Sequence, residues 1–494
     1  MNKKIIKMIL PLVLSSFFVG CNENTSSLTS EASSVASSVT LSQPSSVEET
    51  HVPTTYYASP EGKPTNDGSK ENPYDLFKAF ASLKKGDTLV LLDGTYLSET
   101  RFLIEEGRNG DEENKITVKA ENPGKVILDF SRMPFDSNNR GIQINANWWV
   151  LYGLIVRGAG DNGIYIGGHH NWVEKCETYK CRDTGIQLGR ASSLHQKIES
   201  WPSFNTIINC TSHDNADPTG EDSDGFACKL TTGIGNVFKG CIAYNNIDDG
   251  WDLYTKADSG PIGPVLLEDC VAFNNGVTSD GIGLESSDGN GFKLGGESIA
   301  VQHIVKNCVA FNNLAHGFTD NSNPGSIWIE NCTSYNNSIR EVDANNIDLA
   351  RDISLSNGNY FKNILSYSSG EYANTSHYET QMTNSRDQYY GSASHCVFFN
   401  GLTTLKIEGI EKCDYSSEQY RGQPFKLSTT PFVSTEVPQV GKDESGNYDY
   451  YLLRDENFNV DLGDFLRLKD NSELRTMGEN SSYLGASLTS KEAK

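Results

Sequence analysis

The sequence predicts an all-β protein, a single-stranded right-handed parallel β-helix with a short N-terminal capping helix, and three observations support this prediction. Two short motifs alternate along much of the chain, and most of the 11 cysteines fall inside one of them. The composition, with 45 glycines, 10% aromatic residues and 16 prolines, favours many short strands. Repeats at this spacing indicate a solenoid, and parallel coils of this kind wind right-handedly.

The first motif is a cysteine followed by small and aromatic residues and then a polar end. Its copies are Cys176-Glu-Thr-Tyr, Cys210-Thr-Ser-His-Asp, Cys241-Ile-Ala-Tyr-Asn-Asn, Cys270-Val-Ala-Phe-Asn-Asn, Cys308-Val-Ala-Phe-Asn-Asn, Cys332-Thr-Ser-Tyr-Asn-Asn and Cys396-Val-Phe-Phe-Asn. The second motif is a glycine-led strand, with copies Asn162-Gly-Ile-Tyr-Ile, Thr184-Gly-Ile-Gln-Leu, Asp224-Gly-Phe-Ala-Cys, Asp249-Gly-Trp-Asp-Leu, Asn290-Gly-Phe-Lys-Leu and His316-Gly-Phe-Thr. Each rung is therefore predicted to hold a Cys strand, a polar turn and a Gly-led strand.

Inward-facing small residues predict how the rungs stack. Cysteine, alanine and serine at the same motif positions fit a tight core, so the cysteines are expected to be buried thiols, with a Cys176–Cys181 bridge left as a local exception. Asparagines at the turn can form a ladder of side-chain hydrogen bonds. A short amphipathic helix over Tyr74 to Leu83 is expected to cap the open end of the solenoid.

The chain divides into four predicted parts. Residues 1–20 have a basic start and an apolar stretch too short to span a membrane, as in a signal peptide. Phe18-Val19-Gly20-Cys21 resembles a bacterial lipobox, which predicts lipidation of Cys21, with ordinary signal-peptide cleavage as the alternative. Residues 21–52, rich in Ser, Thr and Glu, read as a disordered tether, residues 53–400 as the β-helix, and residues 401–494 as terminal strands and loops packed on it.

These features predict an exported bacterial lipoprotein at the outer membrane, the cell surface or the periplasmic face, with secretion as an alternative. The lipid anchor is the only expected membrane contact, and a monomer is expected. The formal net charge of -23 argues against nucleic acid as a partner. An acidic substrate would be repelled too, unless a bound cation neutralised the site.

Two rungs carry insertions at the same turn. The usual offset from the Cys to the Gly-led strand is eight residues, as from Cys241 to Asp249, but it is 14 from Cys210 to Asp224 and 20 from Cys270 to Asn290. A third extra stretch, Arg190 to Asn205, follows a Gly-led strand. Insertions on one side of a solenoid usually build the binding face, which places the groove beside the Gly-led strands.

Within the Gly-led strands, side chains alternate in and out, so Asp252 and Lys293 are predicted to face outward. They share a column with Tyr165, Gln187, Ala227 and Thr319, and neighbouring rungs lie about 4.8 Å apart. Asp224 and Asp249 occupy equivalent turn positions one rung apart, and Asp248 adjoins the latter.

Four carboxylates in so small a patch repel one another unless they are protonated or bind a cation. Calcium takes several oxygen ligands, so Asp224, Asp248, Asp249 and Asp252 are predicted to hold Ca²⁺. The alternative is that these aspartates only form Asp-Gly turns.

This geometry suits one reaction in particular. A uronic acid has an acidic C–H at C5 beside its carboxylate, and removal of that proton builds charge that a calcium ion stabilises. Lys293, with its pKa lowered by the adjacent cation, is the predicted Brønsted base.

Asp224-Gly-Phe-Ala, Asp248-Asp249-Gly-Trp-Asp252 and Asn290-Gly-Phe-Lys293 resemble the site motifs of the family-nine polysaccharide lyases, from about residue 55 to the end of the β-helix. That family comprises pectate, exopolygalacturonate and rhamnogalacturonan lyases. The resemblance implies the same calcium ligands and the same lysine, and a pectic substrate, either homogalacturonan or rhamnogalacturonan I. It leaves the choice of uronan and endo or exo attack open, and the long insertion before Asn290 departs from the pattern.

Two further residues are predicted to contact substrate. Lys229 alternates outward and could pair with a second uronate, and Arg182 lies in a turn where a charge is unusual; each is also compatible with an ordinary surface charge. Two other functions stay open at this level. One is a glycoside hydrolase that uses Asp224 with Asp248 or Asp249, and the other is a non-catalytic glycan-binding solenoid.

Overall fold

The computed structural model describes residues 51–337, 345–350, 357–369, 387–399, 404–427, 429–443 and 446–491. The predicted signal peptide, the lipidation site Cys21 and the tether up to residue 50 lie outside these residues. In the described part of the chain, no helix has the length and apolarity needed to cross a membrane.

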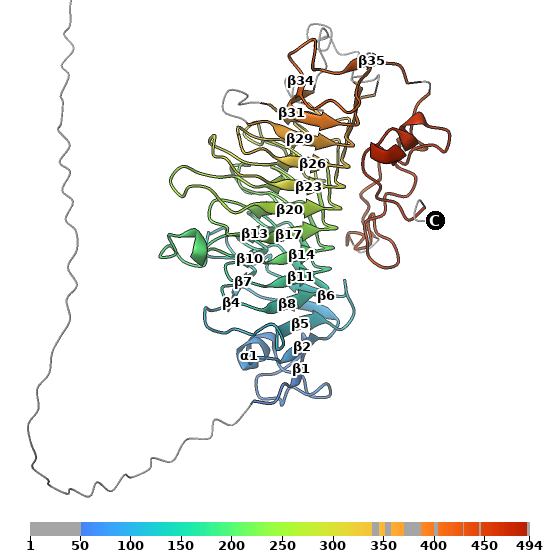
Figure 1. Cartoon of the computed structure of the whole chain (residues 1–494). Helices are drawn as coiled ribbons and strands as arrows, with labels where there is room; N and C mark the ends of the chain where they lie inside the picture. The colour runs from blue at the N-terminus through green and yellow to red at the C-terminus, as the bar shows by residue number, and fades with distance from the viewer. Residues whose placement is uncertain are drawn as a thin grey trace, which may run out of the picture. The chain divides into compact units, whose positions relative to one another are not determined.

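The described residues from β1 (Thr55–Ala58) to β32 (Cys396–Phe399) form a parallel β-helix, as predicted, in which successive coils stack along the chain (Figure 1). Each regular coil contributes one strand to each of three parallel walls, here called sheets A, B and C. The glycine-led strands form sheet C, and the strands after the cysteines form sheet B. The third strand of each coil, in sheet A, was not predicted, because no constant cysteine or glycine marks it in the sequence.

The strands of sheet A are β1 (Thr55–Ala58), β2 (Thr88–Leu91), β5 (Ile116–Ala120), β8 (Trp149–Tyr152), β11 (Trp172–Glu174), β14 (Thr206–Ile208), β17 (Asn236–Lys239), β20 (Val265–Glu268), β23 (Ile304–Lys306), β26 (Trp328–Glu330) and β29 (Asn359–Lys362). Those of sheet C are β4 (Phe102–Ile104), β7 (Ile142–Ile144), β10 (Ile164–Ile166), β13 (Ile186–Leu188), β16 (Phe226–Cys228), β19 (Trp251–Asp252), β22 (Phe292–Lys293), β25 (Phe318–Thr319) and β28 (Ile347–Leu349). Strand β31 (Gln388–Ser394) pairs with both β28 and β29, so it joins the two walls.

The strands of sheet B are β3 (Gly94–Leu97), β6 (Val126–Asp129), β9 (Leu154–Arg157), β12 (Glu177–Tyr179), β15 (Thr211–His213), β18 (Ile242–Tyr244), β21 (Val271–Phe273), β24 (Val309–Phe311), β27 (Thr333–Tyr335), β30 (Leu365–Tyr367) and β32 (Cys396–Phe399). Antiparallel strands β33 (Thr404–Ile407) and β35 (Gln423–Phe425) extend this sheet, and β34 (Cys413–Asp414) pairs antiparallel with β31. Short 3-10 helices cover Ile198–Ser200, Glu473–Thr476 and Glu479–Ser481.

The predicted capping helix is α1 (Leu76–Ser82). It begins at Asp75, whose side chain accepts a hydrogen bond from the Lys78 backbone N–H at 2.7 Å and so satisfies one of the unpaired donors of the first turn. Leu76 and Phe80 are buried, and the Phe80 ring stacks on Phe102 of β4 at 5.1 Å between centroids. The helix therefore adds its apolar face to the first coils.

The interior matches the predicted stacking of small residues. All ten cysteines in the described residues are free thiols and buried, which confirms the prediction and leaves Cys176 and Cys181 unbridged. The predicted asparagine ladder is also present: side-chain N–H groups donate to the next asparagine oxygen at 2.8–3.1 Å through Asn215, Asn246, Asn275, Asn313, Asn337 and Asn346. The ladder runs along the turn between sheets B and C, so it supports the turn that carries the aspartates.

The terminal segment, in the described residues 429–443 and 446–491, runs back along the outer face of sheet B (red in Figure 1). Outward residues of β18, β21 and β24 pack against Phe432, Phe465 and Leu468 of this segment in one apolar cluster. The buried Arg454 guanidinium donates hydrogen bonds to the carbonyls of Gly240 at 2.8 Å and Cys210 at 3.0 Å. The terminal segment therefore covers the outer face of sheet B at these strands.

Candidate functional site

The predicted outward column is present on sheet C. Its strands pair in register, so that Ala227 lies beside Asp252, and Asp252 beside Lys293. Tyr165, Gln187 and Thr319 continue the same column, as the alternation predicts. The flanking residues Trp251 and Phe292 point inward, where they are buried and stack at 4.8 Å between centroids. The inward aromatic ladder thus fixes the strands whose outer side carries the polar column.

The three turn aspartates form one compact cluster. Oxygens of Asp224, Asp248 and Asp249 all lie within 4.8 Å of one another, and the three residues are buried. Asp249 lies one rung from Asp224, whose Oδ1 accepts a hydrogen bond from the Asp249 backbone N–H at 3.3 Å. The equivalent turn positions read from the sequence therefore hold the carboxylates together.

The electrostatics of this cluster suit a cation. Burial raises the pKa of Asp248 and Asp249, and repulsion among the carboxylates, which Lys293 opposes, raises it further. Asp249 Oδ2 is buried and takes no hydrogen bond, although Lys293 Nζ lies 3.2 Å away. An unbonded buried carboxylate oxygen within a set of oxygen donors fits a hard divalent ion such as Ca²⁺.

Lys293 lies beside the cluster, as predicted. Its ammonium is 3.2 Å from Asp249 Oδ2 and 2.7 Å from Asp288 Oδ2. Burial lowers the pKa of Lys293, but the carboxylates of Asp249, Asp252 and Asp288 raise it more, so the net shift is upward. Asp288 lies within the long insertion before Asn290 and was not predicted; its nearness to Lys293 in sequence was the available signal.

The structure does not leave Lys229 as the exposed cation that alternation suggested. Its side chain is 9% exposed, and its ammonium pairs with Asp224 Oδ2 at 2.7 Å and Asp252 Oδ2 at 3.1 Å. Alternation gives the side of the wall on which a lysine emerges, but the long side chain bends back toward the nearest carboxylates. Lys229 therefore neutralises part of the aspartate cluster, and its contact with a uronate stays a prediction.

Arg182 is exposed and lies in the turn before β13. It is absent from the linings of the described cavities on the sheet C side. Among the described residues, no ion pair or hydrogen bond links its guanidinium to the aspartates, and its predicted role in binding substrate stays a prediction.

Comparison with known proteins places this arrangement in a family. Residues 56–361 match the family described as Pel9A-like, right handed beta helix region. A pectate lyase L of Paenibacillus polymyxa (strain SC2) is 40% identical over 432 residues, which cover 87% of this chain and 85% of that protein. The chain belongs to the Pel9A-like family.

Other family relatives agree with this placement. A pectate lyase L of Thermoclostridium stercorarium is 46% identical over 283 residues, 57% of this chain and 22% of that protein. The crystal structure of pectate lyase Pel9A aligns with a TM-score of 0.63 and 25% identity, covering 89% of this chain and 97% of that one. A rhamnogalacturonan lyase shares the fold at a TM-score of 0.59 and 23% identity. The chain is a polysaccharide lyase, and the hydrolase and non-catalytic alternatives find no support.

In this Pel9A-like chain, a cavity of about 380 Å³ lies over Lys293 and Asp252. The insertions before Asp224 and Asn290 supply part of its lining, including Glu221, Asp222 and Asp288. The extra residues recognised in the sequence thus stand beside the Gly-led strands, where the groove was expected.

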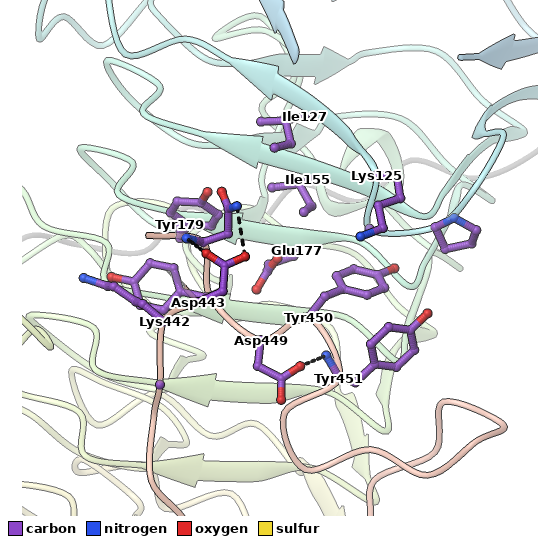
Figure 2. Close-up of a pocket in the computed structure, with 15 residues that line it drawn as sticks. Lys125, Ile127, Ile155, Glu177, Tyr179, Lys442, Asp443, Asp449, Tyr450 and Tyr451 are labelled. Atoms are coloured by element: carbon purple, nitrogen blue, oxygen red, sulfur yellow. Dashed lines mark hydrogen bonds between the residues drawn. The ribbon is translucent and has the colours of Figure 1, made fainter. Parts of the chain in front are cut away.

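A cavity of about 530 Å³ lies on the other wall, where the terminal segment crosses sheet B (Figure 2). Ile127, Ile155 and Glu177 face it from the sheet, and Asp449 and Tyr450 face it from the terminal segment (Figure 2). Its lining contains none of the predicted site residues. It is therefore separate from the aspartate cluster.

Proposed function

We propose that this protein cleaves a galacturonate-containing pectic polysaccharide by calcium-dependent β-elimination, with Lys293 as the Brønsted base. The observation that carries the proposal is the position of the Lys293 amine, 3.2 Å from Asp249 Oδ2 in a cluster of three mutually close carboxylates. Relatives named pectate lyase support the substrate class.

The residues proposed to hold the ion are Asp224, Asp248, Asp249 and Asp252. When bound there, calcium would supply electrostatic stabilisation to a uronate carboxylate as charge develops at the adjacent C5 carbon. The carboxylates attract the cation and thereby reverse the local repulsion between a chain of net charge -23 and an acidic sugar.

Lys293 performs the proton transfer in this proposal. The carboxylates raise the pKa of Lys293, and a cation bound among them would offset this effect and favour the neutral amine. The neutral amine takes the C5 proton, the C–H electron pair forms the C4–C5 double bond, and the C4–O bond breaks with the electron pair leaving on oxygen. Asp249 and Asp288 hold the lysine nitrogen over the groove through contacts of 3.2 and 2.7 Å. A positioned base contributes typically 10²–10⁴-fold to a rate.

The direct test is Lys293→Ala. We expect the rate of formation of the ultraviolet-absorbing unsaturated product from polygalacturonate to fall by about 10²–10⁴-fold, because the base is lost. Lys306→Ala, on β23 of sheet A, is the matched control and should keep the wild-type rate. A folded Lys293→Ala protein with the wild-type rate would end the base assignment, and a wild-type protein that yields only saturated reducing ends would end the lyase mechanism.

Chelation tests the metal separately. We expect dialysis against a chelator to abolish cleavage and added Ca²⁺ to restore it, since the aspartates alone cannot neutralise the substrate carboxylate. Full activity in the chelator would exclude the metal role. The same assay on homogalacturonan and on rhamnogalacturonan I, with product sizing, identifies the uronan and the mode of attack.

We also propose that the protein is exported and lipidated at Cys21, on the support of the basic and apolar N-terminal pattern and the residues before that cysteine. Fatty-acid labelling of the full chain should be lost in Cys21→Ser. Equal labelling of both proteins would contradict the anchor.

A further inference from the structure

The groove on sheet C continues into a second cavity of opposite charge. This cavity has a volume of about 670 Å³, and Lys229 and Lys256 line both it and the cavity over Lys293. Arg140 and Arg190 add two more cations to its lining, against one acidic residue, Asp258. The cavity over Lys293 instead has five acidic lining residues, which are Glu221, Asp222, Asp248, Asp252 and Asp288. The groove therefore changes from acidic to basic along its length.

Two hydrogen bonds hold the backbone of Arg190, whereas no ion pair with another described residue holds its guanidinium. Its N–H donates to Thr231 Oγ1 at 3.1 Å, and its carbonyl accepts a hydrogen bond from the Tyr165 hydroxyl at 3.0 Å. Among the described residues, no carboxylate lies within 4.0 Å of its guanidinium. Arg140 differs, because it pairs with Asp161 at 3.1 Å and stacks 3.5 Å from the centre of the Tyr165 ring.

The insertion Arg190 to Asn205 builds this side of the groove. Ser192, Gln196 and Trp201 from that stretch line the basic cavity, and the Trp201 indole N–H donates to the His195 carbonyl at 3.0 Å. Arg190 follows β13, whose outward residue Gln187 lies three steps before Lys293 in the sheet C column. Three steps of about 4.8 Å make roughly 14 Å. A sugar at Arg190 is therefore not the sugar whose bond breaks at Lys293.

We infer that Arg190, assisted by Lys256, binds the carboxylate of a second uronate in the same polysaccharide chain, several sugars from the cleaved bond. The inference rests on the proposed function and extends it to chain length: the enzyme binds long acidic chains better than short ones. A planar guanidinium that pairs with no described carboxylate can bind a substrate carboxylate through two parallel hydrogen bonds. Lys256 is exposed, and no carboxylate of the described residues lies within 4.0 Å of its ammonium.

The test compares two substrate lengths. Arg190→Gln should raise KM for long polygalacturonate roughly tenfold, the loss expected for one hydrogen-bonded charge pair, and leave kcat nearly unchanged. On trigalacturonate, which is too short to reach both Lys293 and Arg190, the variant should match the wild type. Lys256→Gln should show the same pattern with a smaller change, and the effect should shrink in high salt.

Arg467→Gln is the matched control, because it removes the same charge from the terminal segment, where Arg467 pairs with Asp464 at 2.8 Å. It should leave the ratio of the two KM values unchanged. An equal loss on both substrate lengths in Arg190→Gln would overturn the inference, and so would an unchanged KM on the long chain. A wild-type protein that cleaves neither of these substrates, and does not cleave rhamnogalacturonan I, would instead overturn the proposed function.

Discussion

Sheets B and C belong to the same coils but carry opposite kinds of outer surface. On sheet B, the outward residues Tyr244, Phe273 and Phe311 form a stacked aromatic row with centroids 4.7–5.0 Å apart, and the terminal segment covers them. On sheet C, the corresponding outward column holds Asp252 and Lys293 and lines an open cavity. The inward sides of both walls are buried; sheet C carries large apolar residues there, and sheet B carries small ones such as Ala243 and Ser212.

This difference distinguishes the inward residues, which stabilise the fold, from the outward residues of sheet C, which form the proposed site. Inward residues can be predicted from the repeat, because every coil needs them to fill the core. The outward residues depend on what lies outside each wall. The terminal segment covers sheet B, whereas sheet C lines an open groove. Substitutions on sheet C should therefore change activity more than stability, and those on sheet B should do the reverse.

The largest expected effect is that of Asp249→Asn. We expect cleavage to fall by about 10²–10⁴-fold, as for loss of a positioned catalytic group, because the ion loses one carboxylate. The melting temperature without calcium should stay the same or rise. Burial and the neighbouring carboxylates raise the pKa of Asp249, which means that its charged form is unfavourable in the folded protein, and the neutral amide removes that charge. Asp249 Oδ1 accepts a hydrogen bond from the Asn290 backbone N–H at 2.7 Å, which the amide oxygen can keep.

Melting curves with calcium and with chelator check this prediction. Wild-type protein should melt higher with calcium, and Asp249→Asn should lose most of that increase. Asp470→Asn, whose side chain is 94% exposed, is the control and should keep both the activity and the calcium response. A calcium response of wild-type size in Asp249→Asn would place the ion elsewhere.

The next effect lies on the covered wall. Phe311→Ala should cost about 3–5 kcal/mol of stability, because it opens a cavity in a buried aromatic cluster. The Phe311 ring stacks on Phe273 at 4.7 Å and meets Phe465 edge-on at the same distance. Urea unfolding measures the loss, with Phe135→Ala, 51% exposed, as the control. Activity per folded molecule should stay unchanged; a selective loss of activity would contradict the separation of the two walls.

A smaller effect, on both stability and activity, is expected from the asparagine ladder in the turn between sheets B and C. Asn275 is fully buried, accepts from Asn246 at 3.0 Å and donates to Asn313 at 2.8 Å. Asn275→Ala should cost about 1–3 kcal/mol, because its neighbours are left with unpaired buried groups. Activity should fall too, since the ladder supports the turn of Asp248 and Asp249. Urea unfolding and initial rates check both, with exposed Asn457→Ala as the control, and a stability loss without any loss of activity would contradict the coupling.

The sequence was sufficient for the features that repeat. The Cys strands, the Gly-led strands, the asparagine ladder and the outward column all recur with a fixed offset, so alternation predicted that Asp252 and Lys293 pair across adjacent rungs, which the register confirms. The calcium and the roles of these residues stay proposals. The family resemblance rested on the same repeated positions, and the match over residues 56–361 confirms the family.

The sequence was insufficient where no repeat applies or where a side chain is long. Asp288 lies in an insertion, and Arg190 begins another, so neither had an aligned partner that would show which way it points. Lys229 emerges on the expected side, but its four-carbon stem brings the ammonium back to Asp224. Such contacts depend on which charged groups surround the side chain, and only the stacking of the coils brings those groups together.

The smallest predicted effect concerns pH and belongs to sheet B. His213 is fully buried; its Nδ1 lies 2.7 Å from Asp214 and its Nε2 3.1 Å from Glu177. Its ring stacks between Tyr179 and Tyr244 and meets Tyr448 edge-on. Burial lowers the pKa of His213, but the two carboxylates raise it more, so the folded-state pKa lies above the ordinary value of 6.5.

The proton on His213 therefore stabilises the folded state fully below about pH 6.5, and that stability is lost as the pH rises through the higher folded-state pKa. Each unit of pKa shift is worth about 1.4 kcal/mol. We expect the melting temperature of wild-type protein to fall from pH 6.5 toward pH 9 more steeply than that of His213→Gln, which has no titrating ring. Parallel curves would show that the buried ring carries no charge. Because His213 lies on the covered wall, the dependence of cleavage on calcium concentration should be the same in both proteins.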